Sequence, residues 1–185
     1  MRKRTLLNLL VIAFVLSFFV TPLGHFSKVL LMQLFAKAPK VIAIAESTKI
    51  PTYNWKLKDE NWDFFDFKRS EGKLVILEFW ASWRLPSLPE LKTLQSLYND
   101  YQNEIDFYFI TDENREPVEE FMNKNHFSFP VTYLIIGEPT PVLVNEPPRS
   151  YLIDQQGNVL ISQHGTTNWN SETVRNLLDS LIQKK

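Results

Sequence analysis

The sequence predicts a mixed α/β domain that follows an apolar N-terminal helix. Three observations support this prediction: an uncharged apolar stretch at residues 5–23, a nearly continuous apolar run at residues 73–80, and apolar residues at three- and four-residue steps in residues 86–100. The first has the length of a membrane-spanning helix, the second is typical of a central strand, and the third of an amphipathic helix. With 185 residues, 44% of them hydrophobic, the chain has room for one packed domain and a tail.

The N-terminal segment predicts a single-pass transmembrane anchor at residues 1–23. Arg2, Lys3 and Arg4 precede the apolar stretch, and basic flanks stay on the cytoplasmic side of a membrane. We therefore expect the anchor to lie in the inner (cytoplasmic) membrane, with the following chain exported to the periplasmic side. A cleaved signal peptide is the alternative, but its small-residue cleavage pattern first occurs at Ala36, well past the apolar stretch.

Residues 24–49 predict a juxtamembrane linker between the anchor and the domain. Two interpretations of this segment remain open. Its apolar residues can form an amphipathic helix at the membrane interface, or the spanning helix can continue beyond a kink at residues 22–24.

Counts of charged residues and cysteines exclude several functions. Residues 1–40 contain six Lys or Arg and no acid, so the remaining chain has 14 basic and 21 acidic residues, a net charge of −7. An acidic domain is a poor nucleic-acid binder, and no nucleic-acid partner is expected. The absence of cysteine excludes disulfides, thiolate metal sites, a cysteine nucleophile and a dithiol redox centre.

The domain itself is predicted at residues 50–185. Tyr53, Trp55 and Leu57 alternate with polar residues, which predicts a half-buried edge strand, and an irregular aromatic stretch follows at residues 62–67. Periodicity then predicts strands at 73–80 and 105–111, helices at 86–100 and 116–125, a β-hairpin at 149–154 and 159–164, and a last helix capped by Asn170 or Ser171. The resulting order, β-α-β-α-β-β-α, is that of a thioredoxin-like fold.

One motif carries a resemblance to a known family. Residues 79–90, FWASWRLPSLPE, place a four-residue loop between a strand and a helix, as in the membrane-anchored TlpA/ResA-type thioredoxin-like (redoxin) family of bacterial envelopes. YNWKLKD near residue 55, PRSYLID at 148–154, and Gly165 followed by WNS at 169–171 are also similar to that family. The resemblance covers about residues 50–183 and implies its fold.

The chemistry of that family does not carry over with the fold. The family's loop has two cysteines separated by two residues, the first at a helix N-terminus, where its pKa is lowered. Arg84 and Ser87 stand at those positions here. Neither side chain can cycle between a dithiol and a disulfide, so we expect no thiol-disulfide oxidoreductase activity.

Three scaffold residues of the family are present. Glu78 matches an acid that the family's relatives bury beneath the dithiol, and Glu90 matches an active-site glutamate. The alternative for Glu90 is an acid in the N-terminal turn of the helix, favoured there by the helix dipole. Pro148 matches a cis-proline beside the active site, where the preceding residue binds an extended peptide. That residue is Pro147, which has no N–H, and either proline can carry the cis bond.

Arg84 has two interpretations. It is an exposed arginine tolerated without a redox role, or it recognises an anion such as a carboxylate. A cation near a helix N-terminus opposes the dipole, so we expect Glu78, Glu90 or a bound anion to offset its charge.

Two functions from different classes follow. We favour a redox-inactive module that binds a polypeptide partner through Trp83, Arg84, Leu85 and Pro148. The alternative is an oxidoreductase-family member that contributes to redox homeostasis only with a cysteine-bearing partner. A degenerate copy without selected activity is a third possibility.

No cofactor or metal is expected. His25, His126 and His164 are far apart in the sequence and show no metal-ligand spacing. Each histidine is therefore interpreted as structural.

Overall fold

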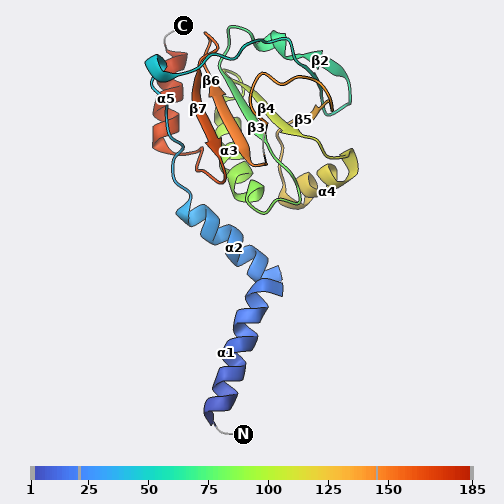
Figure 1. Cartoon of the computed structure of the whole chain (residues 1–185), viewed down its shortest axis with the longest axis vertical. Helices are drawn as coiled ribbons and strands as arrows, with labels where there is room; N and C mark the ends of the chain where they lie inside the picture. The colour runs from blue at the N-terminus through green and yellow to red at the C-terminus, as the bar shows by residue number, and fades with distance from the viewer. Residues whose placement is uncertain (1–2, 21, 145, 184–185) are drawn as a thin grey trace.

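A seven-stranded mixed sheet lies at the centre of the domain (Figure 1). The computed structural model describes residues 3–20, 22–144 and 146–183. Its strands are β1 (Lys56–Lys58), β2 (Phe64–Asp66), β3 (Val75–Phe79), β4 (Asp106–Thr111), β5 (Val131–Leu134), β6 (Arg149–Ile153) and β7 (Val159–His164). Its helices are α1 (Lys3–Val20), α2 (Pro22–Phe35), α3 (Ser87–Tyr101), α4 (Arg115–Asn125) and α5 (Glu172–Ile182), with short 3-10 turns η1 (Ile44–Glu46) and η2 (Phe67–Ser70).

The strand order, β2-β1-β5-β4-β3-β6-β7, confirms the thioredoxin-like fold. β3 pairs in parallel with β4, and β4 with β5, so their carboxyl ends lie at one edge of the sheet. β6 runs antiparallel to β3 and brings Ser150 opposite Glu78. The start of α3, the end of β4 and the start of β6 therefore meet at the same edge, where the candidate site lies.

Each of the two faces of the sheet packs against its own hydrophobic cluster. Side chains alternate along each strand, so Ile76 of β3 packs on one face and its neighbour Leu77 on the other. The first face is covered by the helices α3, α4 and α5, whose apolar stripes include Leu94, Val118 and Leu178. Segments outside the helices cover the second face. All five residues of β3 are buried, as predicted for a central strand.

Two predictions about strands are wrong. β1 is not at the edge: it begins only at Lys56 and lies between β5 and β2, and β2 forms within the stretch interpreted as irregular. The alternation of apolar and polar residues indicates which side chains face the core. It does not indicate whether a strand has one neighbouring strand or two. β5 was not predicted at all, because four residues directly after Pro130 are too short for a clear period.

The predicted helices are confirmed to within two residues. α3 begins at Ser87 and α4 at Arg115, and α5 begins after Ser171, whose Oγ accepts a hydrogen bond from the N–H of Val174 at 3.4 Å. Ser171 is therefore the N-cap, which decides between the two residues that the sequence left open.

Two successive helices, α1 and α2, lead from the N-terminus to the domain (Figure 1). The predicted anchor at residues 1–23 includes Met1, Arg2 and Thr21, which lie outside the described residues. Within the part of the chain that the structure describes, no helix combines the length and the apolar character needed to cross a membrane.

The segment after α2 lies along the outer edge of β7. The N–H of Ile42 donates to the carbonyl of Leu160 at 2.8 Å, and the N–H of Val159 donates to the carbonyl of Thr48 at 2.8 Å. An exposed strand edge is a template for unwanted pairing, and these contacts cover it in part. Residues 42–50, most of which the sequence assigned to a linker, are thus hydrogen-bonded to the domain.

Candidate functional site

The loop at residues 81–86 joins β3 to α3 and holds three of the predicted site residues, Trp83, Arg84 and Leu85. The N–H of Arg84 donates to the carbonyl of Ala81 at 3.1 Å, and the N–H of Ser87 donates to the carbonyl of Arg84 at 3.0 Å. The N–H of Ala81 also donates to Ser87 Oγ at 3.3 Å. Ser87 is fully buried, whereas Trp83 at the tip of the loop is 66% exposed. The loop is therefore closed by its own hydrogen bonds and presents an indole ring to solvent.

Arg84 is held by two contacts outside the helix. Its Nη2 lies 2.9 Å from Glu146 Oε2, and its guanidinium carbon lies 4.7 Å from the centroid of the Trp83 ring. The expectation that Glu78 or Glu90 offsets this charge is wrong, because Glu146 does so. The Nε of Arg84 is buried and has no hydrogen-bond partner among the described residues.

The amino-terminal side of the loop is fixed by Glu113. Ser82 donates to this carboxylate from its backbone N–H at 2.5 Å and from its Oγ at 2.6 Å. Glu113 follows the end of β4, which lies beside the end of β3. Neither Glu113 nor Glu146 was identified from the sequence. The parallel pairing of β3 with β4 could have indicated Glu113, because it brings the residues that follow the two strands to the same edge of the sheet.

Glu90 is the centre of a buried hydrogen-bond network. Its Oε1 accepts hydrogen bonds from Ser150 Oγ at 2.9 Å, Thr167 Oγ1 at 3.0 Å and Trp169 Nε1 at 3.0 Å. Its Oε2 is buried without a partner in the described chain. Burial raises the pKa of Glu90 from 4.5 to about 7, although these hydrogen bonds lower it. Glu90 lies in the first turn of α3, as the alternative interpretation has it, and it is also fully buried.

Glu78 is a second buried acid on the same face of the sheet. It is fully buried in β3, and neither carboxyl oxygen has a hydrogen-bond partner among the described residues. Burial and the nearby Glu90 raise the pKa of Glu78 well above its ordinary value. The neutral, protonated form of Glu78 is therefore favoured in the folded protein.

The second loop of the site carries the cis peptide bond, between Pro147 and Pro148. Pro148 is buried, and its carbonyl accepts a hydrogen bond from the N–H of Gly165 at 3.0 Å. Gly165 has a φ of +82°, in the left-handed region that glycine adopts readily. Pro147 lines a cavity of about 60 Å³ together with Phe79, Trp80, Ile110, Thr111, Asp112, Leu134 and Val144.

The structure places the four predicted binding residues at different depths. Trp83 is exposed, Arg84 and Leu85 are half-buried, and Pro148 is buried. The ion pair to Glu146, two residues before Pro148, connects the loop of Arg84 with the loop of the cis bond. The small cavity beside Pro147, lined also by the carboxyl ends of β3 and β4, lies next to these two loops and is called the groove below.

The fold and this site define a thioredoxin-like protein whose two thiol positions hold arginine and serine. No model of a protein family matches the chain. The chain is 32% identical over 167 residues to the thiol-disulfide oxidoreductase ResA of Bacillus cereus, an alignment that covers 86% of this chain and 88% of the relative. It is 24% identical over 140 residues to the thioredoxin-like protein YneN of Bacillus subtilis, covering 74% and 80%. The chain belongs to the TlpA/ResA-like redoxin family.

Solved structures support the fold. A DsbF homologue from Corynebacterium diphtheriae superposes with a TM-score of 0.60 at 15% identity, covering 80% of this chain and 94% of that one. A thiol:disulfide interchange protein from Chlorobium tepidum superposes with a TM-score of 0.57 at 19% identity, covering 73% and 97%. At such identities the likeness concerns the fold alone.

Proposed function

We propose that this protein is a membrane-anchored, redox-inactive member of its family that binds a polypeptide partner. One observation carries the proposal: Arg84 and Ser87 occupy the two thiol positions, while the loop at residues 81–86 and the cis-proline loop are joined by the Arg84–Glu146 ion pair next to the groove. A scaffold that lacks the reactive groups retains its surface for binding.

Thiol-disulfide exchange is not open to this chain by itself. The reaction requires a thiolate that attacks a disulfide sulfur, and the 185 residues include no cysteine. The hydroxyl of Ser87 is buried and accepts the N–H of Ala81, so it is not presented to a substrate. The binding of a polypeptide is the part of the family's activity that needs no thiol.

The surface beside the groove has the composition of a binding site. Trp83 is exposed and Arg84 stacks on its ring, and tryptophan and arginine are enriched among the residues that dominate binding energies. Pro147 has no N–H, so its carbonyl is the one backbone hydrogen-bonding group it offers to an extended peptide. Side-chain contacts therefore contribute more of the affinity here than in relatives with a complete backbone clamp.

Membrane anchoring by the N-terminal helix is the second part of the proposal. Nine large apolar side chains of α1 are about half or more exposed. They are Leu6, Leu7, Leu9, Leu10, Val11, Ile12, Phe14, Val15 and Leu16. Water does not stabilise such a surface, whereas a bilayer does, and the preceding basic residues favour a cytoplasmic N-terminus. The domain is then on the periplasmic side.

Proximity cross-linking of the anchored protein in its native envelope tests the binding role. We expect Trp83→Ala to reduce recovery of the partner about tenfold, the scale of a binding hot spot. Trp62→Ala is the matched control, because Trp62 is the other exposed tryptophan of the described chain and lies outside the groove. Equal loss in both variants, or in neither, contradicts a role for this face.

Insulin reduction by the purified protein separates this proposal from the oxidoreductase alternative. We expect no reduction by the natural chain alone, and Arg84→Cys with Ser87→Cys provides the matched positive control. Activity of the natural chain contradicts the proposal. Activity that emerges only with an added cysteine-containing envelope protein supports the alternative instead.

A further inference from the structure

The Arg84–Glu146 ion pair joins the loop at residues 81–86 to the cis-proline loop. We propose that Arg84 binds a carboxylate of the partner polypeptide, and that Glu146 takes the place of this carboxylate when no partner is bound. This inference rests on the proposed binding function and specifies the chemistry of the partner: an ionised Asp or Glu side chain, or a C-terminal carboxylate.

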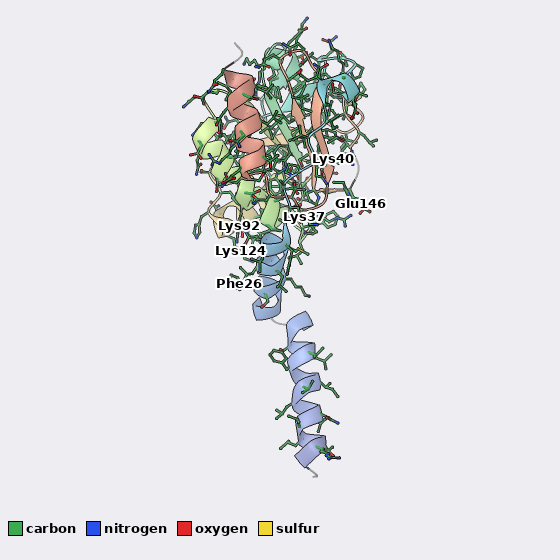
Figure 2. All side chains as sticks on the ribbon, turned by 90° about the vertical axis from the view of Figure 1, so that its left-hand side faces the viewer. Phe26, Lys37, Lys40, Lys92, Lys124 and Glu146 are labelled. Carbon is green, nitrogen blue, oxygen red and sulfur yellow. The ribbon has the colours of Figure 1, made fainter. Side chains whose placement is uncertain are left out.

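The two members of the ion pair differ in exposure. The Arg84 side chain is 30% exposed and the Glu146 side chain 73% exposed. Figure 2 shows Glu146 at the rim of the domain, near the end from which α2 leaves. Glu146 therefore returns to water at little cost when it is displaced, whereas Arg84 stays half-buried in its loop. The exchange of one carboxylate for another requires an acid that can leave, here Glu146, and a cation that stays in place, here Arg84.

Arg84 uses only part of its hydrogen-bonding capacity. The ion pair joins one nitrogen, Nη2, to one oxygen of Glu146 at 2.9 Å, and Nε is buried without a partner among the described residues. By contrast, Arg175 donates from Nε to Asn170 Oδ1 at 2.7 Å and from Nη2 to Asp100 Oδ2 at 2.5 Å. A partner carboxylate that takes the place of Glu146 reaches the same Nη2 donor in a charge-assisted contact.

Trp83 holds Arg84 in place for this role. The guanidinium carbon lies 4.7 Å from the ring centroid, and a stacked guanidinium keeps its in-plane N–H groups free to donate. A lysine at this position has one point charge and no planar fork. The acidic pair Glu78 and Glu90 is buried in the helix-covered layer, so the contact that neutralises Arg84 comes from Glu146.

Peptide binding with matched acid and amide probes tests this inference. We expect a set of fluorescein-labelled nine-residue peptides with a central Asp or Glu to bind the full chain in detergent about tenfold more tightly than twins with Asn or Gln, measured by anisotropy. Twins with free and amidated C-termini test the terminal carboxylate. Arg84→Gln should abolish the difference within each pair of twins.

Glu146→Gln tests the role of the internal carboxylate. Removing the competitor should tighten binding of the acidic peptides about threefold to tenfold and leave the amide twins unchanged. Glu138→Gln is the matched control, because it removes the same charge from the same connection between β5 and β6. An unchanged unfolding midpoint of each variant shows that the fold is intact.

Each remaining outcome has a definite meaning. Equal affinity for acid and amide twins overturns carboxylate recognition and leaves the proposed polypeptide binding intact. Unchanged or weaker binding of acidic peptides to Glu146→Gln overturns the stand-in role of Glu146. Absence of binding by every peptide, at any charge, contradicts the proposed function itself and this inference with it.

Discussion

Charged side chains have different surroundings on the two sides of the loop at residues 81–86. On the groove side, Arg84 has an ionic partner and both members reach solvent. On the helix-covered side, Glu78 and Glu90 are fully buried, and three of their four carboxyl oxygens have no partner in the described chain. On the exposed side, Arg84 can exchange its ionic partner. On the buried side, ionisation of Glu78 and Glu90 is electrostatically unfavourable. Stability measurements can separate the two sides.

The largest expected effect is a loss of stability as pH rises. The pKa of Glu90 is raised from 4.5 to about 7, and that of Glu78 is raised well above its ordinary value. The folded state thus favours the protonated acids, so their contribution is complete below about pH 4.5. The contribution of Glu90 is lost as pH rises through about 7, and that of Glu78 is also lost as pH rises, above its ordinary pKa. For Glu90 alone this corresponds to about 3 kcal/mol. Denaturant unfolding at pH 4.5 and pH 8 measures it, and equal stability at both values contradicts the burial of charge.

Glu78→Leu should stabilise the protein by about 2 kcal/mol at pH 8 and by less at pH 4.5. The substitution replaces an unpartnered buried carboxyl by an apolar side chain in an apolar layer. Glu138→Leu, in a partly exposed loop, is the control and should change the free energy of unfolding little. A destabilised Glu78→Leu variant would show that this acid has a partner in solution.

Thr167→Val should lower the free energy of unfolding by about 1 kcal/mol at pH 8. The valine keeps the shape of the side chain but removes the hydroxyl that donates to Glu90 Oε1 at 3.0 Å. In Glu90→Gln the same substitution should have a smaller effect, because the acceptor no longer carries charge. Equal effects in both backgrounds would exclude a charge-assisted bond.

Glu146→Gln should have the smallest effect, less than about 0.5 kcal/mol on the free energy of unfolding at low salt and less still at high salt. The reason is the exposure of the Glu146 side chain, which leaves the ion pair screened by water. A loss comparable to that of Thr167→Val would show that the ion pair is structural and would remove the contrast between the two sides.

The comparison also shows which parts of the site could be predicted from the sequence. The motif at residues 79–90, with Glu78 directly before it, located the loop, its helix and the two acids, because loop position follows from local periodicity. The state of Glu90 was not predictable, since its partners Ser150, Thr167 and Trp169 lie 60 to 79 residues away in the chain. The pairing of Arg84 with Glu146 was not predictable for the same reason, since these residues are also far apart in the sequence.

The sequence by itself determined the central strands β3 and β4, the helices α3, α4 and α5, and the exclusion of thiol chemistry. These follow from side-chain periods and from composition, which are local or countable properties. Only the tertiary structure decided that β1 is an inner strand, that β5 exists, that Glu78 and Glu90 share one buried layer, and that Glu146 neutralises Arg84. Neighbours in a sheet and partners of a charge are chosen across long separations, by packing that no short window of sequence contains.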